Sequence, residues 1–273
     1  MRNDSSTRLT VDDLIFGTST LHHLLLSKDR CHILRNAFEV GVSCFDTSPF
    51  YGDGLAESCL ADVFGDVPDL VRISTKIGLD ARGLRPGSIA NTIAVKFVQK
   101  LSCQRMFSVR VPNSSRFAYD SIVRSVGESF ARLGRIRTDT LFLHEPYAAE
   151  WPQIERLIPF LSSLLNSGDI KQIGLSGYAK ECLSIQKESG YFFSRIQIED
   201  DPLLTQSSLL QENGVSVDAL FGVLRTAYAA GSSLSASQIF REAYQRSPGK
   251  KFLFSTTKIQ HLKNLISGLS DGD

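Results

Sequence analysis

The chain has 273 residues, and 42% of them are hydrophobic, which is enough to fill one sizeable core. Its formal net charge of +1 gives no overall field that would draw it to nucleic acid or to an anionic membrane. No apolar run reaches the roughly 18 to 20 residues that a membrane span needs, and the polar N-terminal segment predicts no secretory signal. The five cysteines are scattered and form no C-x-x-C pair, which is typical of reduced thiols, so the sequence favours a cytoplasmic protein.

Short apolar runs alternate along the chain with segments of helical periodicity. The runs predict eight strands, at 14–17, 42–46, 71–75, 140–143, 172–176, 195–199, 215–220 and 252–255. Apolar residues recur on one face of the segments 28–40, 117–133 and 151–166, which predicts helices there. This alternation favours parallel βαβ units of the α/β class, and eight such units favour closure into a (β/α)8 TIM barrel. An open, doubly wound sheet would produce the same alternation.

The segment 77–116 departs from this rhythm. No linker or break in composition accompanies it, so residues 1–273 are predicted to form one domain in which these 40 residues are a long loop after the third strand. The segment holds seven basic residues and a single acid, Asp80. In a barrel it would lie on the C-terminal face, where active sites form. It is then either a solvated loop or a lid that attracts an anionic group on the substrate or cofactor.

Four polar residues stand at or just after the ends of predicted strands. Asp46 ends the second strand, and Tyr51 lies in the loop that follows it. Lys76 ends the third strand, and His144 ends the fourth. Because consecutive strand ends line one rim of a barrel, these side chains are expected to converge. Each of them alone has an ordinary structural explanation, but together they predict a catalytic site.

The four side chains form a chemically sensible set. A phenol with its ordinary pKa near 10 exchanges protons poorly at neutral pH. The Lys76 ammonium is expected to lower the pKa of Tyr51, and the Asp46 carboxylate is expected to keep the lysine charged. His144 can hydrogen-bond a substrate carbonyl and fix its orientation. The set predicts general acid–base catalysis at a carbonyl carbon, completed by hydride transfer with a nicotinamide cofactor.

The residues around these positions resemble the aldo-keto reductase superfamily over nearly the whole chain. The segment FDTSPFYGDGLAE at 45–57 is similar to the family signature Asp-Thr-x-x-x-Tyr-Gly-x-x-x-x-Glu. The segment 71–78 is similar to the family strand that carries the lysine, and 125–146 is similar to the helix and strand that deliver the histidine. The segments 171–179 and 195–203 are similar to the strands that hold the nicotinamide amide. The resemblance implies that Tyr51 is the proton donor and that Lys76, paired with Asp46, tunes it. It also implies that His144 orients the carbonyl.

The resemblance also implies a cofactor site, with NADP(H) favoured and NAD(H) as the alternative. Ser176 and Gln197 match positions that hydrogen-bond the carboxamide, and Asp46 matches one beside the ribose. The positions that match the adenine-side phosphate region are Ser255, Thr256, Thr257, Lys258 and Asn264, the first three of which are predicted to open the last helix. Two positions depart from the family pattern. Gly177 stands where asparagine is frequent, and Leu220 stands where an aromatic stacks on the nicotinamide, with Phe221 adjacent as a substitute.

The branch most similar to this chain contains bacterial sugar and pyridoxal dehydrogenases. The expected function is therefore an NAD(P)(H)-dependent oxidoreductase acting on a small aldehyde, ketone or sugar, with no nucleic-acid or membrane partner and no metal. One alternative is a regulatory subunit on the same fold that binds the cofactor with little or no turnover. Another is an unrelated barrel lyase or isomerase in which Lys76 forms a Schiff base.

Overall fold

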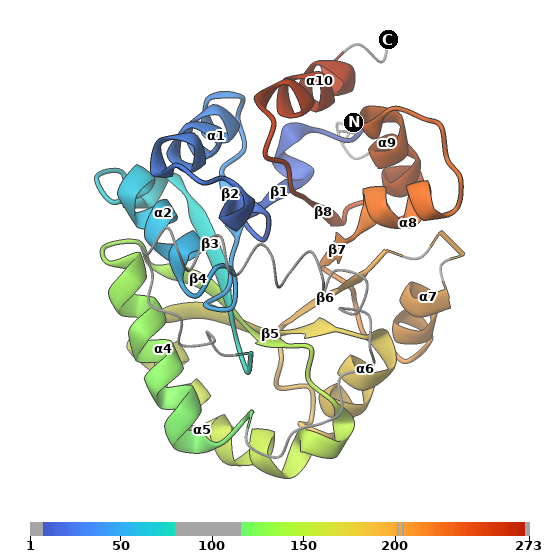
Figure 1. Cartoon of the computed structure of the whole chain (residues 1–273). Helices are drawn as coiled ribbons and strands as arrows, with labels where there is room; N and C mark the ends of the chain where they lie inside the picture. Colours follow the sequence, from blue (N-terminus) through green and yellow to red (C-terminus); the bar gives the residue numbers. More distant parts are fainter. Residues whose placement is uncertain (1–7, 80–115, 201, 204, 271–273) are drawn as a thin grey trace, which may run out of the picture.

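A computed structural model describes residues 8–79, 116–200, 202–203 and 205–270, and it contains a closed parallel barrel (Figure 1). Each strand pairs in parallel with the next strand along the chain, and the eighth pairs with the first. The strands are β1 (Leu14–Gly17), β2 (Cys44–Asp46), β3 (Arg72–Ile77), β4 (Thr138–His144), β5 (Ile170–Gly177), β6 (Arg195–Glu199), β7 (Ala219–Phe221) and β8 (Lys251–Phe254). The (β/α)8 TIM barrel is thus confirmed, and the open sheet is excluded.

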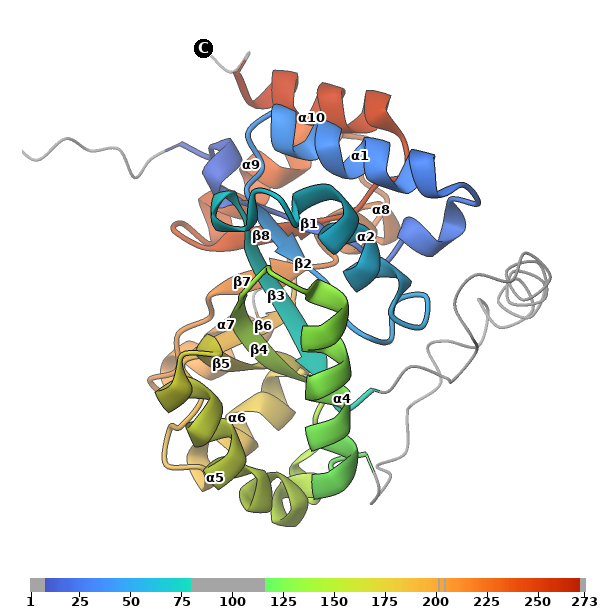
Figure 2. The same ribbon diagram turned by 90° about the vertical axis from the view of Figure 1, so that its left-hand side faces the viewer.

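Helices surround the barrel, as Figures 1 and 2 show from two directions. The α-helices are α1 (Ser27–Glu39), α2 (Leu55–Phe64), α4 (Tyr119–Leu133), α5 (Trp151–Ser167), α6 (Ala179–Glu188), α7 (Thr205–Glu212), α8 (Val223–Ala229), α9 (Ala236–Arg246) and α10 (Ile259–Ser270). Short 3-10 turns span Val11–Asp13, Leu21–His23, Pro68–Leu70 and Ala148–Glu150. Within the described residues, no helix is long and apolar enough to cross a bilayer.

Aromatic side chains join the first, second and last strands where the barrel closes. Phe16 of β1 packs against Phe45 of β2 with ring centroids 6.0 Å apart, and against Phe254 of β8 at 5.3 Å. Phe16 and Phe45 are almost fully buried. Fully burying one such side chain stabilises the fold by about 1.5–3 kcal/mol. These contacts therefore help to hold β1 and β2 against β8, where the barrel closes.

The predicted strands and helices match the observed ones to within a few residues, and the largest difference lies at the start of the seventh strand. The third strand runs on through Lys76 to Ile77, two residues beyond its predicted end. The seventh strand was predicted at 215–220, but its pairing with β6 begins only at Ala219, opposite Gln197. The alternation that suggested an earlier start reflects burial of Val215 and Val217 in the connection from α7.

Most of the basic loop predicted at 77–116 lies outside the described residues, so its suggested role as a lid stays a prediction. Arg116, at its end, is described. Its guanidinium donates to both carboxylate oxygens of Glu150, at 2.9 and 2.6 Å, and to the backbone carbonyl of Glu145 at 2.8 Å. Arg116 therefore anchors the start of the segment that leads into α4, close to the end of β4.

A buried ion pair ties α2 to α4. Glu57 is fully buried, and it accepts hydrogen bonds from Arg132 Nε and from Thr75 Oγ1, both at 2.7 Å. Since an uncompensated buried carboxylate is costly, we expect Arg132→Leu to lower the free energy of unfolding by about 3 kcal/mol. Arg124→Leu is the matched control because Arg124 is exposed on the same helix. Denaturant unfolding followed by circular dichroism measures both variants, and equal stability of the two would contradict the expectation.

Candidate active site

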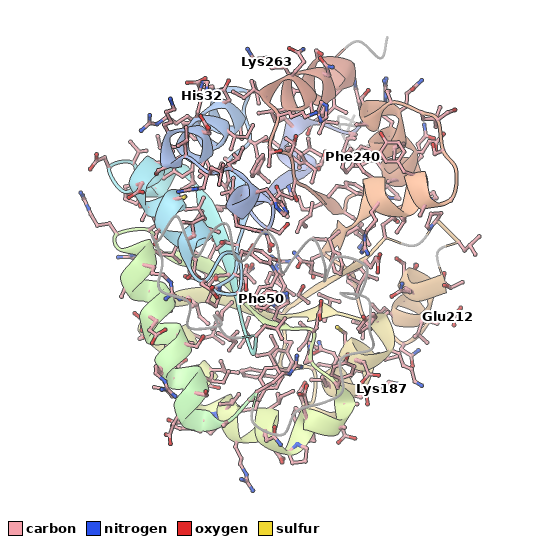
Figure 3. All side chains as sticks on the ribbon, in the orientation of Figure 1. His32, Phe50, Lys187, Glu212, Phe240 and Lys263 are labelled. Carbon is pink, nitrogen blue, oxygen red and sulfur yellow. The ribbon has the colours of Figure 1, made fainter. Side chains whose placement is uncertain are left out.

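A pocket of about 440 Å³ opens at the C-terminal ends of the strands. Figure 3 labels Phe50, from the loop after β2, near the centre of the view. All four residues predicted to be catalytic line the pocket. The structure therefore brings together Asp46, Tyr51, Lys76 and His144, although they come from three different strands and one loop.

Lys76 and Asp46 form a buried ion pair on the floor of this pocket. Each side chain is only 2% exposed. Lys76 Nζ donates to Asp46 Oδ1, and also to the carbonyl of Thr47 at 3.1 Å. Burial lowers the pKa of Lys76, but the Asp46 carboxylate and Tyr51 outweigh it, so the pKa is raised above its ordinary 10.5. The lysine is therefore cationic at neutral pH.

Tyr51 lies directly above this ammonium group. Its hydroxyl is 3.3 Å from Lys76 Nζ, and the Nζ atom is 5.0 Å from the centre of the phenol ring. The turn that places Tyr51 needs backbone conformations that glycine adopts freely, because Gly52 and Gly54 have φ of 65° and 85°. A side chain at Gly54 would also come within 2.7 Å of Arg132. The glycines of the signature segment thus let the tyrosine reach the pocket.

Lys76 lowers the pKa of Tyr51, as the sequence predicts, but this contribution does not decide the net direction of the shift. Burial of the phenol raises its pKa, the ammonium of Lys76 lowers it, and the carboxylate of Asp46 raises it again. Burial dominates, so the pKa of Tyr51 lies above 10.0. At neutral pH the residue is a protonated phenol, which suits it to donate a proton, while its ionised form needs alkaline conditions.

His144 stands beside the phenol at the end of β4. The two rings are 6.0 Å apart and perpendicular, and the ring of Phe50 meets His144 edge-on at 6.5 Å. The hydroxyl of Ser48 lies 3.4 Å from Nδ1 of His144. The imidazole is buried, with 7% of the residue exposed, so its orientation is fixed by these neighbours. It is placed to contact a group that also contacts Tyr51.

A second hydrogen-bonded group connects Asp46 to the opposite side of the barrel. Asp46 Oδ2 accepts from Ser74 Oγ at 3.1 Å and from Gln197 Nε2 at 3.3 Å. Gln197 Oε1 in turn accepts from Ser176 Oγ at 2.6 Å. Ser176, Gln197 and Asp46 are almost fully buried and line the pocket together. Both residues predicted to hold a carboxamide, Ser176 and Gln197, are therefore adjacent and already oriented.

Packing explains one of the two departures from the family pattern. A Cβ atom at Gly177 would lie 3.1 Å from Cα of Glu145, and Glu145 itself has a φ of +48°, which is unusual for a residue with a side chain. Gly177 thus leaves room for the tight turn directly after His144. At the other departure, Phe221 lines the pocket, whereas Leu220 does not, among the described residues. An aromatic ring is therefore present on the pocket wall, one residue later than the usual position.

The residues predicted to bind the adenine side are only partly gathered at the pocket. Ser255 lines it, and its hydroxyl is 3.5 Å from that of Ser19. The prediction that Ser255–Thr257 open the last helix is corrected, because α10 begins at Ile259 and Thr256 Oγ1 instead accepts from the Lys258 amide at 3.1 Å. The described lining of the pocket does not include Thr256, Thr257, Lys258 and Asn264, whose role stays a prediction.

Several further residues that line the pocket were not predicted from the sequence. They come from the connections that follow β1, β4 and β7, and are Ser19, Thr20, Glu145, Gly222, Val223, Leu224 and Arg225. The side chain of Arg225 is half exposed and pairs with Glu199 of β6. Loops and the first turn of a short helix such as α8 carry little periodic signal, so only the position of these segments after a strand end could have indicated them.

The chain thus forms a parallel (β/α)8 barrel whose C-terminal rim gathers a tyrosine, a buried lysine–aspartate pair and a histidine in one pocket. The model of the Aldo/keto reductase family matches residues 13–234, and the chain belongs to that family.

Two curated proteins are similar in sequence. Pyridoxal 4-dehydrogenase of Microbacterium luteolum is 29% identical over 188 residues, which cover 62% of this chain and 53% of that protein. D-threo-aldose 1-dehydrogenase of a Pseudomonas species is 30% identical over 185 residues, with 64% and 53% covered. The matched part of the chain thus spans about half the length of these relatives. A crystal structure of an aldo-keto reductase from Klebsiella pneumoniae in complex with NADPH superposes with a TM-score of 0.63, at 16% identity, covering 94% of this chain and 85% of that one.

Proposed function

We propose that the protein is an NAD(P)(H)-dependent oxidoreductase that interconverts a carbonyl group with an alcohol or sugar hemiacetal. The observation that carries this proposal is the contact of Tyr51 with the buried Lys76–Asp46 pair, beside His144, in one pocket. The relatives named for oxidising pyridoxal and D-threo-aldoses support a small aldehyde or sugar as the substrate class.

The pocket fits a nicotinamide dinucleotide, with NADP(H) favoured over NAD(H). Ser176 and Gln197 offer a hydroxyl and a primary amide, the donor and acceptor types that bind a carboxamide. Phe221 offers an aromatic face on the same wall. A Cβ atom at Gly17 would come within 3.1 Å of Ser255 Oγ, so the glycine keeps this edge of the pocket open. The NADPH complex of the Klebsiella pneumoniae family member supports the choice of cofactor.

In this proposal the bound cofactor supplies or accepts a hydride, and the residues of the chain handle the proton and the orientation. During reduction, His144 holds the carbonyl oxygen and Tyr51 donates its phenolic proton to that oxygen. Lys76 stabilises the phenolate that remains, and Asp46 keeps the lysine in place. During oxidation the same atoms act in reverse, with ionised Tyr51 accepting the proton of the substrate hydroxyl.

Fluorescence titration with NADPH and with NADH tests the cofactor class directly. The fluorescence of the reduced nicotinamide reports binding directly. Saturable binding of either compound supports the proposal, and turnover of an aldose or of pyridoxal distinguishes an enzyme from a regulatory subunit that only binds the cofactor. Folded protein that binds neither compound would rule out the proposed function.

The carboxamide contact can be tested separately. We expect Gln197→Leu to weaken binding of the preferred cofactor by about tenfold, because one or two hydrogen bonds of about 1 kcal/mol each are lost. Gln245→Leu is a control, since Gln245 is exposed on α9, outside the lining of the pocket. Titration of both variants beside the unmodified protein gives the two dissociation constants. Unchanged affinity in Gln197→Leu would show that the amide sits elsewhere.

A further inference from the structure

A second pocket, of about 490 Å³, lies on the outside of the barrel between α7 and α9. Both helices lie on the right-hand side of Figure 1, and Figure 3 labels Glu212 at the end of α7 and Phe240 within α9. We call this pocket the α7–α9 groove. Its walls include Val217, which lies just before β7, and Lys250, which directly precedes β8. The groove therefore lies near the N-terminal ends of these strands, whereas the candidate active site opens at their C-terminal ends.

Strand β7 separates the two pockets. Leu220 lines the α7–α9 groove, and the next residue, Phe221, lines the candidate active site. Successive residues of a strand point to opposite sides, so each pocket receives one of these side chains. The groove is therefore a distinct cavity, not an extension of the site described above.

Several polar groups in the groove have no partner of their own within the described part of the chain. Arg246 Nε is buried and makes no hydrogen bond to a described residue. The hydroxyls of Ser207, Ser208 and Ser247 likewise make none, although all three residues line the groove and Ser247 is only 8% exposed. A buried donor without an acceptor is unfavourable by about 1–3 kcal/mol, which applies to Arg246 Nε, whereas the three serine hydroxyls are accessible and can donate to a group bound in the groove.

The positively charged side chains in the groove favour a negatively charged acceptor. Arg246 is held in place by Asp200, whose carboxylate accepts from Nη2 at 3.1 Å. Lys250 Nζ bonds Ser216 Oγ at 3.1 Å, and it forms no ion pair with a described residue. The groove thus combines two cations with hydroxyl donors. Guanidinium, ammonium and hydroxyl groups together are the donor types that bind phosphate.

From this juxtaposition we propose that the α7–α9 groove binds the phosphate group of a small molecule, at a site separate from the substrate and cofactor pocket. The Arg246 guanidinium and the Lys250 ammonium attract the phosphate oxygens, and the serine hydroxyls complete the set of donors. The volume exceeds what a phosphate ion fills, and Val217 and Leu220 supply an apolar wall. A phosphate monoester of a small metabolite fits this shape better than free phosphate.

Isothermal titration calorimetry of the full chain, with inorganic phosphate and with glucose 6-phosphate as probes, tests the proposal. We expect saturable binding of both probes, tighter for the ester. Lys250→Glu should weaken it by at least about tenfold, because a charged hydrogen bond is replaced by repulsion. Lys28→Glu, a charge reversal on the exposed face of α1, is the matched control and should bind as the unmodified protein does.

Ser247→Ala is a second variant that preserves the charge of the groove and removes one donor. Circular dichroism establishes that each variant is folded, and Ser247→Ala should weaken binding even if Lys250→Glu proves unstable. Equal affinity of the two probes would identify free phosphate as the ligand. Absence of saturable binding at millimolar concentrations would overturn the proposal. Unchanged affinity in both groove variants would also overturn it, because the anion would then bind elsewhere on the protein.

Discussion

Tyr51→Phe is expected to reduce turnover by about 10²–10⁴-fold while leaving the fold intact. The substitution removes only the hydroxyl, whose hydrogen bond comes from Lys76 Nζ at 3.3 Å. Lys76 keeps its contacts with Asp46 and the Thr47 carbonyl, so the loss of stability should stay near 1 kcal/mol. Steady-state assays with an aldose or pyridoxal, together with thermal unfolding, measure both quantities.

The control for this variant is Tyr191→Phe, because Tyr191 is 53% exposed in the turn after α6. It should retain full activity. Cofactor affinity should also be unchanged in Tyr51→Phe, which separates loss of proton transfer from loss of binding. If Tyr51→Phe turned over substrate at the rate of the unmodified protein, the assignment of the proton donor would be wrong.

The raised pKa of Tyr51 gives this prediction a pH dependence with a definite sign. Reduction uses the protonated phenol, which is present throughout the neutral range and is lost only above the raised pKa, beyond 10.0. Oxidation uses the ionised phenol, whose fraction increases with pH up to that pKa. We therefore expect the rate of oxidation to rise between neutral and alkaline pH, and the rate of reduction to stay flat over the same range. A fall in oxidation with rising pH would contradict this assignment.

Asp46→Asn is expected to have the largest effect on stability. The carboxylate is almost fully buried and accepts hydrogen bonds from Lys76, Ser74 and Gln197, so an amide in its place would turn a donor toward one of them. It would also leave the Lys76 charge without a counterion, and breaking such a pair costs about 3–5 kcal/mol. We expect Tm to fall by roughly ten degrees, and activity to fall with it.

Asp139→Asn provides the comparison for that measurement. Asp139 pairs with Lys171 at 3.0 Å, but the lysine side chain is 67% exposed, so this ion pair lies at the surface. Its loss should cost less than about 1 kcal/mol. Differential scanning calorimetry of the two variants shows whether burial of the ion pair accounts for the difference in lost stability. Similar Tm values would mean that the pair at Asp46 is not a buried structural charge.

The barrel and the four candidate catalytic residues could be predicted from sequence because both depend on strand ends. Apolar runs mark the strands, and polar residues such as Asp46 and His144 mark where they stop. The pKa of Tyr51 could not be predicted, since it depends on the balance between burial and the neighbouring ammonium, and burial is a property of the folded chain. The same holds for Arg225 and for the α7–α9 groove, which are formed by connections and helix edges without a repeating pattern.

Asp46 connects two parts of the site, because it accepts hydrogen bonds from Lys76, beside Tyr51, and from Gln197, on the proposed cofactor side. Under the proposed function, ionisation of Tyr51 and binding of the cofactor are therefore thermodynamically linked through the carboxylate of Asp46. Ionisation of Tyr51 would alter the affinity for the cofactor, and by reciprocity the oxidised cofactor, with its cationic ring, would draw the phenol toward ionisation. The protein would then adjust its own proton affinity to the direction of the reaction, with no change in the fold.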